Sequence, residues 1–83
     1  MIPKILIVDD LKDNRLMIKL TLKKAGDYQF IEAVNGKDGI DMALKELPHI
    51  ILMDAMMPVM DGFEAISILR KNKITKKIPI LMV

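Results

Sequence analysis

The chain has 83 residues and a mass of 9.4 kDa, the size of one small domain. Hydrophobic residues make up 52% and charged residues 29%, a balance that excludes an intrinsically disordered chain. Cysteine is absent, so no disulfide can stabilise the fold. The longest apolar runs are four residues, and two aspartates follow the first of them directly, which excludes a membrane span and a secretory signal. We therefore expect a cytoplasmic protein.

The net charge of +2 is compatible with nucleic-acid binding, but the other features of such proteins are missing. The only aromatic residues, too few for a base-stacking platform, are Tyr28, Phe30 and Phe63. There is also no zinc-finger spacing and no recognisable recognition helix. We expect no nucleic-acid binding by this segment.

The chain opens with a strand followed by a helix. Lys4–Asp9 is apolar almost throughout, which is typical of a strand buried on both faces of a parallel sheet. Asp13–Ala25 is predicted to be a helix, with a glycine at its end. Its apolar face is expected to contain Leu16, Met17 and Leu20.

The second strand and second helix come next. Tyr28–Val34 is predicted to be a strand. Asn35 can cap the following helix, with Asp38 three residues further on, and Pro48 prevents the helix from continuing. Apolar residues recur at the spacing of one helical face: Ile40, Ala43, Leu44 and Leu47.

Two further strands flank a third helix. His49–Asp54 is another apolar strand, and Met56–Gly62 is expected to be a loop. Asp61 and a glutamate three residues later have the spacing of a capping box, for a helix that runs to about Lys71. Ile78–Val83 is the fourth strand. The alternation of apolar strands and helices, βαβαβαβ, predicts an α/β fold with a parallel sheet.

Three aspartates follow the first and third strands, namely Asp9, Asp10 and Asp54. In open α/β sheets, ligands bind outside the carboxyl ends of the strands. If these two strands are neighbours, the three carboxylates converge, and such a cluster needs a cation or a protonated member. Mg²⁺ suits a few carboxylate oxygens, and a carboxylate beside it can accept a phosphoryl group. A single aspartate after a strand is more often a cap or turn former, but three acids at two strand ends share no such role.

The order of these motifs resembles the receiver (CheY-like) domains of two-component response regulators, along the whole chain. The motifs that carry the resemblance are Ile5–Asp10, Ile51–Asp54, Met57–Pro58 and Met60–Gly62. Forty-four positions separate Asp10 from Asp54, a spacing that suits the family. The resemblance implies a flavodoxin-like parallel sheet with strand order 2-1-3-4-5 in the full family. It also implies that Met57–Pro58 and Asp61–Gly62 shape the loop and start the third helix.

The resemblance also implies the role of each site residue. Asp54 would be the phosphorylated aspartate, and it would contact the metal. Asp10 would bind Mg²⁺ directly, Asp9 would act on it mainly through water, and the backbone carbonyl of Met56 would be a further ligand. The phosphodonor would be a histidine kinase or a histidine phosphotransfer protein. The domain would be a phosphoacceptor that assists its own phosphorylation and not an enzyme.

The chain departs from the family pattern after its fourth strand. We expect residues 1–83 to correspond to the N-terminal part of a receiver, without the fifth strand and the last two helices. A hydroxyl residue and a lysine that contact the phosphoryl group in the family would be absent, so we expect slow phosphorylation. We also expect a homodimer through an uncovered sheet face or edge, because the size scaling leaves only about 63% of the surface buried. The strand residues expected to face water are Leu6, Val8, Ile51 and Met53, or their alternate neighbours.

Other interpretations remain open. A phosphohydrolase is disfavoured. Such enzymes present two aspartates separated by one residue, whereas Asp9 and Asp10 are adjacent. They also need a general acid, and none is evident in the sequence. A receiver-derived interaction or assembly fragment without phosphotransfer activity is the main alternative. The first helix also carries a basic stripe that is either a solvated face or a docking surface for the phosphodonor, formed by Lys12, Arg15, Lys19 and Lys23.

Overall fold

The computed structural model describes residues 1–83, and its sheet is parallel with the order β2-β1-β3-β4. The strands are β1 (Lys4–Val8), β2 (Gln29–Ala33), β3 (Ile50–Met53) and β4 (Ile80–Met82). The helices are α1 (Lys12–Lys23), α2 (Gly36–Glu46) and α3 (Gly62–Lys71). The expected α/β fold is confirmed, and the predicted strands extend only one or two residues beyond the observed ends. None of these helices has the length and apolar character needed to cross a bilayer.

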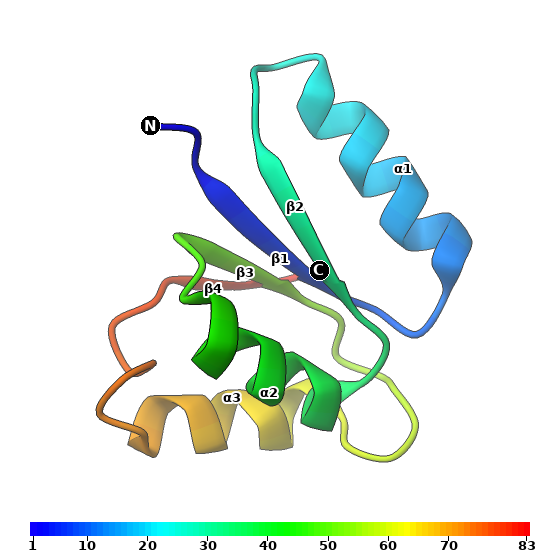
Figure 1. Cartoon of the computed structure of the whole chain (residues 1–83). Coiled ribbons are helices and arrows are strands. Elements are labelled where there is room, and N and C mark those ends of the chain that lie inside the picture. The colour runs from blue at the N-terminus through cyan, green and yellow to red at the C-terminus, as the bar shows by residue number, and fades with distance from the viewer.

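The helices lie on both faces of the sheet, with α2 and α3 on one face and α1 on the other (Figure 1). The larger core lies under α2 and α3. Its buried strand residues are Leu6, Val8, Ile31, Ala33, Ile51 and Met53. The helices contribute Ala43, Ala65 and Leu69. Gly39 lets α2 approach the sheet closely, because a Cβ atom there would lie 3.0 Å from the side chain of Val8.

The second face of the sheet is also covered, which corrects the expectation that one set of strand residues would face water. Ile5, Ile7 and Leu52 are buried on this face. Ile18 and Leu22 of α1 pack against them, together with residues of the strands and the α1–β2 connection. Exposed apolar side chains lie instead on the outside of α1, on β4 and α3, and in several loops.

The rotation of α1 differs from the prediction. Leu16, Met17 and Leu20, expected to face the core, are 48%, 66% and 50% exposed. The face turned to the sheet carries the i, i+3, i+4 and i+7 set of Arg15, Ile18, Lys19 and Leu22. Two cations can lie on this face because both pair with one acidic side chain of β2.

That acidic side chain is Glu32. Its Oε1 accepts from Arg15 Nε, and its Oε2 accepts from Lys19 Nζ, both at 2.9 Å. Arg15 and Lys19, the two middle residues of the basic stripe, are therefore not free in solvent and are not fully available for docking. These ion pairs lower the pKa of Glu32, chiefly through the Lys19 hydrogen bond, with Arg15 adding to the effect against partial desolvation.

Two of the three helices begin with a side-chain cap, and both caps were predicted from the sequence. The Asn35 side chain accepts from the Asp38 N–H at 2.8 Å, and Asp61 accepts from the Glu64 N–H at 2.9 Å. Both predicted caps are confirmed. Helix α1 begins without a side-chain cap, because Leu11 occupies its N-cap position.

Candidate functional site

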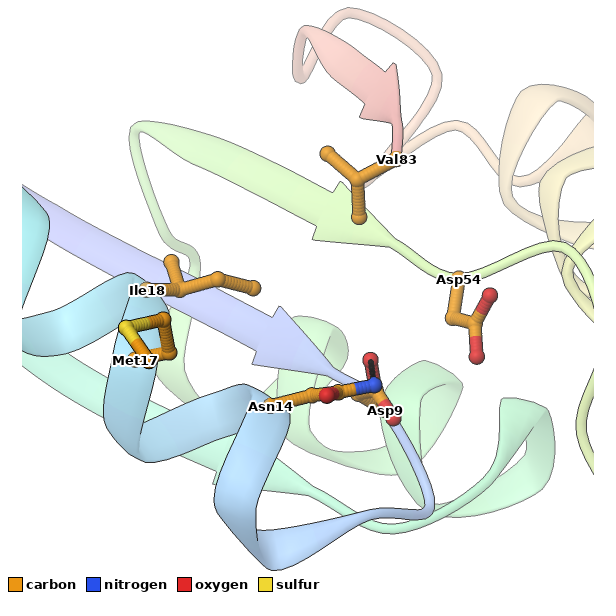
Figure 2. A pocket seen from close by; sticks show the side chains of 6 residues that line it. All are labelled: Asp9, Asn14, Met17, Ile18, Asp54 and Val83. Carbon is orange, nitrogen blue, oxygen red and sulfur yellow. Dashed lines mark hydrogen bonds between the residues drawn. The ribbon is translucent and has the colours of Figure 1, made fainter.

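The site lies where β1 and β3 end side by side. Val8 pairs with Met53 in the parallel ladder, so Asp9 and Asp54 follow their strands at the same level (Figure 2). The main chain of both acids continues the ladder. The Asp9 N–H donates to Ala33 O at 3.1 Å, and the Asp54 N–H donates to Val8 O at 2.9 Å. The sheet register thus fixes the main-chain positions from which both carboxylate side chains extend.

The predicted convergence of the three carboxylates is present. One oxygen from each of Asp9, Asp10 and Asp54 lies within 4.8 Å of the others. No cationic side chain pairs with them, because the ion pairs of the chain are Lys4–Glu46, Arg15–Glu32 and Lys19–Glu32. Three unneutralised carboxylates at such distances repel one another, and an all-oxygen set of this kind suits a hard divalent cation. The donor chemistry therefore fits Mg²⁺.

Asp9 and Asp54 differ in their surroundings. Asp9 is only 3% exposed, and both of its carboxylate oxygens accept hydrogen bonds: Oδ1 from the Leu11 N–H at 2.9 Å, and Oδ2 from Asn14 Nδ2 at 3.4 Å. Asp54 is less buried, and its carboxylate accepts one hydrogen bond, from the Met56 N–H to Oδ1 at 3.4 Å. Met56 itself lies exposed in the loop that follows. Asp54 therefore keeps lone pairs for a ligand, whereas Asp9 has fewer.

The first turn of α1 contributes contacts that the sequence reasoning missed. Besides Asn14, Arg15 donates from Nη1 to the main-chain oxygen of Asp9 at 2.7 Å. The only sign of these contacts in the sequence is that both residues follow Asp9 within six residues. Their side-chain directions, however, depend on how α1 is rotated against β2.

The loop between β3 and α3 is held by two glycines. A Cβ atom on Gly62 would lie 2.1 Å from the main-chain oxygen of Asp54, and the Gly62 N–H donates to Ala55 O at 3.0 Å. A Cβ atom on Gly36, at the start of α2, would lie 2.5 Å from Met60 O, which accepts from the Gly36 N–H at 2.9 Å. The loop is therefore packed directly against the starts of α2 and α3.

Within this loop, Val59 has a φ angle of 70°. The Met60 N–H donates to Pro58 O at 2.8 Å across it, so the three residues form a tight γ-turn. A β-branched side chain is disfavoured at positive φ, so this turn is strained.

A cavity of about 260 Å³ opens beside the two strand ends. Its polar lining consists of Asp9, Asn14 and Asp54, and its apolar lining consists of Met17, Ile18 and Val83 (Figure 2). The less buried Asp54 carboxylate is therefore accessible from this cavity.

Comparison with known proteins agrees with this geometry. The family model "Response regulator receiver domain" matches residues 5–83. Protein PilH of Pseudomonas aeruginosa is 40% identical over 80 residues, which cover 96% of this chain and 65% of PilH. The chain thus spans slightly less than two thirds of that relative.

Solved structures are similar over almost the whole chain. The chemotaxis response regulator CheY4 of Vibrio cholerae has a TM-score of 0.89 and 38% identity, covering 99% of this chain and 68% of that one. The receiver domain of a sensor histidine kinase from Pseudomonas aeruginosa, with a magnesium ion coordinated in its active site cleft, has a TM-score of 0.90 and 28% identity. That alignment covers 99% of this chain and 66% of that one. Since the family model, the sequence relatives and the strand order all agree, the chain belongs to the response regulator receiver domains, the signalling domains of two-component systems.

Proposed function

We propose that this chain is a phosphoacceptor that receives a phosphoryl group on Asp54 from a histidine kinase or a histidine phosphotransfer protein. The observation that carries the proposal is the gathering of three carboxylates within 4.8 Å at the ends of β1 and β3. Among them we assign Asp54 as the nucleophile, because it lines the cavity, which Asp10 does not, and accepts only one long hydrogen bond. Asp9 is buried, and both of its oxygens are occupied.

The proposed metal ligands are the carboxylates of Asp10 and Asp54 and the backbone carbonyl of Met56, with Asp9 acting through water. The absence of a cationic partner for these acids supports this assignment. So does the magnesium ion in the histidine kinase receiver from Pseudomonas aeruginosa. When bound, Mg²⁺ would neutralise part of the charge on the acids and on an incoming phosphoryl group.

The chemical step is a displacement at phosphorus. A carboxylate oxygen of Asp54 forms the new O–P bond while the bond from phosphorus to the donor atom breaks, and the electron pair leaves with the donor. The main chain of Asp54 is held by its hydrogen bond to Val8, so the nucleophile starts from a defined position. On this proposal the chain accepts one phosphoryl group and does not turn over a substrate, so it is not an enzyme.

Several finer expectations stay predictions. These are a cytoplasmic location, the absence of nucleic-acid binding, and the assignment of residues 1–83 to the N-terminal part of a receiver. A homodimer also stays a prediction. It is supported by the exposed apolar side chains of α1 and by Leu81 on β4, which is 57% exposed. A receiver-derived assembly fragment without phosphotransfer is the alternative that such a surface would favour.

The test has two stages. Addition of Mg²⁺ should shift the amide signals of residues 9–10 and 54–57, and a small phosphodonor should then add the mass of one phosphoryl group. Asp54→Asn should abolish this labelling. Asp61→Asn is the matched control, because Asn also caps a helix well and Asp61 lies outside the acidic cluster.

Equal labelling of wild type and Asp54→Asn would refute the assignment of Asp54. An intact fold with neither Mg²⁺ response nor labelling would support the assembly fragment instead.

A further inference from the structure

Asn14 is the one side chain that donates a hydrogen bond to the carboxylate of Asp9. We propose that Asn14 is a positioning residue that holds this carboxylate in place for the divalent cation of the site. The inference rests on the metal site proposed above and extends it to a residue of α1. Figure 2 shows Asn14 reaching from the first turn of α1 toward Asp9, beside the cavity that Asp54 also lines.

The two donors to Asp9 act on different oxygens. The Leu11 N–H binds Oδ1 and Asn14 Nδ2 binds Oδ2, so together they define the plane of the carboxylate. With the Leu11 contact alone, the group could rotate about its Cβ–Cγ bond. Because Asp9 is 3% exposed, loss of the Asn14 contact would also leave a buried anionic oxygen with less compensation for its lost hydration.

The chemistry of an amide suits this position. Asn14 offers an N–H without a charge, so it orients the carboxylate without competing with a bound cation. A lysine or arginine would neutralise Asp9, and an acid would repel it. Arg15 is adjacent, but its Nε and Nη1 are taken by Glu32 and by the main-chain oxygen of Asp9. Its guanidinium therefore fixes the main chain of Asp9 and not its carboxylate.

The position of Asn14 is itself fixed. Arg15 and Lys19 both pair with Glu32 of β2, which sets the rotation of α1 about its axis. This rotation points Asn14 at the end of β1. Residues that orient the direct ligands of a metal typically change its affinity about 10–100-fold when they are replaced, and because Asp9 acts on the cation through water, Asn14 belongs at the lower end of that range.

The experiment measures Mg²⁺ affinity from the shifts of the amide signals of residues 9–10 and 54–57. Asn14→Leu keeps a similar side-chain size, favours the helix and removes the donor. Because the contact is long, we expect the dissociation constant to rise about tenfold, the lower end of that range. Thr21→Leu is the matched control, an exposed polar residue of α1 about two turns away, and it should leave the constant within twofold.

A double-mutant cycle with Asp9→Asn separates positioning from a general effect on the helix. If Asn14 acts through Asp9, then Asn14→Leu should cause no further loss in the Asp9→Asn background. The side-chain amide signal of Asn14 should also shift in Asp9→Asn without any metal present. This second readout does not require the Leu variant to fold.

The outcomes are distinguishable. A wild-type chain that shows no Mg²⁺ response refutes the proposed metal site, and this inference with it. A wild type that binds Mg²⁺, with unchanged affinity in Asn14→Leu, overturns the positioning role alone. An equal loss of Mg²⁺ affinity in the wild-type and Asp9→Asn backgrounds would also overturn it. So would a side-chain amide signal of Asn14 that does not shift in Asp9→Asn.

Discussion

Replacement of Gly62 by alanine tests how closely α3 is packed against the main chain of Asp54. The new Cβ atom would lie 2.1 Å from the main-chain oxygen of Asp54 and 3.0 Å from Cγ of Met53. The main chain cannot move away easily. The Asp54 N–H is bonded to Val8 O, and the Gly62 N–H is bonded to Ala55 O.

The expected cost follows from these contacts. Overpacking typically destabilises by about 1–3 kcal/mol, and a clash with main-chain atoms belongs at the upper end. Replacing glycine by alanine in a helix returns at most about 1 kcal/mol, and less in its first turn. We therefore expect a net loss of about 2 kcal/mol in the free energy of unfolding. A domain of this size has only about 4–12 kcal/mol in total.

Urea unfolding followed by far-ultraviolet circular dichroism measures this loss. Gly26→Ala is the matched control, because the atoms nearest to its Cβ atom would be those of the Tyr28 side chain, at 3.5–3.6 Å, an ordinary contact. This variant should stay within about 0.5 kcal/mol of wild type. The displaced Asp54 of Gly62→Ala should also bind Mg²⁺ more weakly. If the two alanine variants are equally stable, the close approach of α3 to Asp54 is not as described.

Two further predictions concern strain and pH. Val59→Gly should raise the free energy of unfolding by about 1 kcal/mol, because relief of the φ of 70° exceeds the added chain entropy of glycine, and unchanged urea unfolding would contradict this. The pKa of Glu32 is lowered, mainly by the Lys19 hydrogen bond, so its stabilisation is complete above the ordinary value of 4.5 and is lost as pH falls through the lower folded value. Glu32→Gln should therefore cost about 0.5–1 kcal/mol at neutral pH, a modest figure because the side chain is partly exposed, and nothing in strong acid. A difference that stays constant with pH would argue against these ion pairs.

Local signals in the sequence were sufficient for the elements and for the acidic cluster. Asn35 and Asp61 are followed three residues later by the N–H groups that they cap. Both are interactions within one helical turn, which a sequence pattern can report. The convergence of Asp9 and Asp54 needed one further step, the adjacency of β1 and β3, which the alternating strands and helices made the natural topology.

The rotation of α1 could not be predicted in this way. The helix has apolar residues on more than one side, and Leu16, Met17 and Leu20 form as plausible a core face as Ile18 and Leu22. The choice depends on Glu32, an acidic residue of β2 that draws two cations toward the sheet. Such an ion pair between distant parts of the sequence cannot be predicted from the hydrophobic periodicity of the helix. The contact of Asn14 with Asp9 depends on the same rotation, which is why it was missed.

Because β1 and β3 end at the same level, the site can tolerate insertions and deletions at some positions of the chain and not at others. Val8 pairs with Met53, and the two acids follow at once. Insertion of one residue within either strand would move one aspartate by about 3.3 Å along the sheet and turn its side chain to the opposite face. Insertions in the connection between α1 and β2 would leave this alignment untouched. Length variation among functional homologues should therefore collect at that end of the sheet, away from the acids.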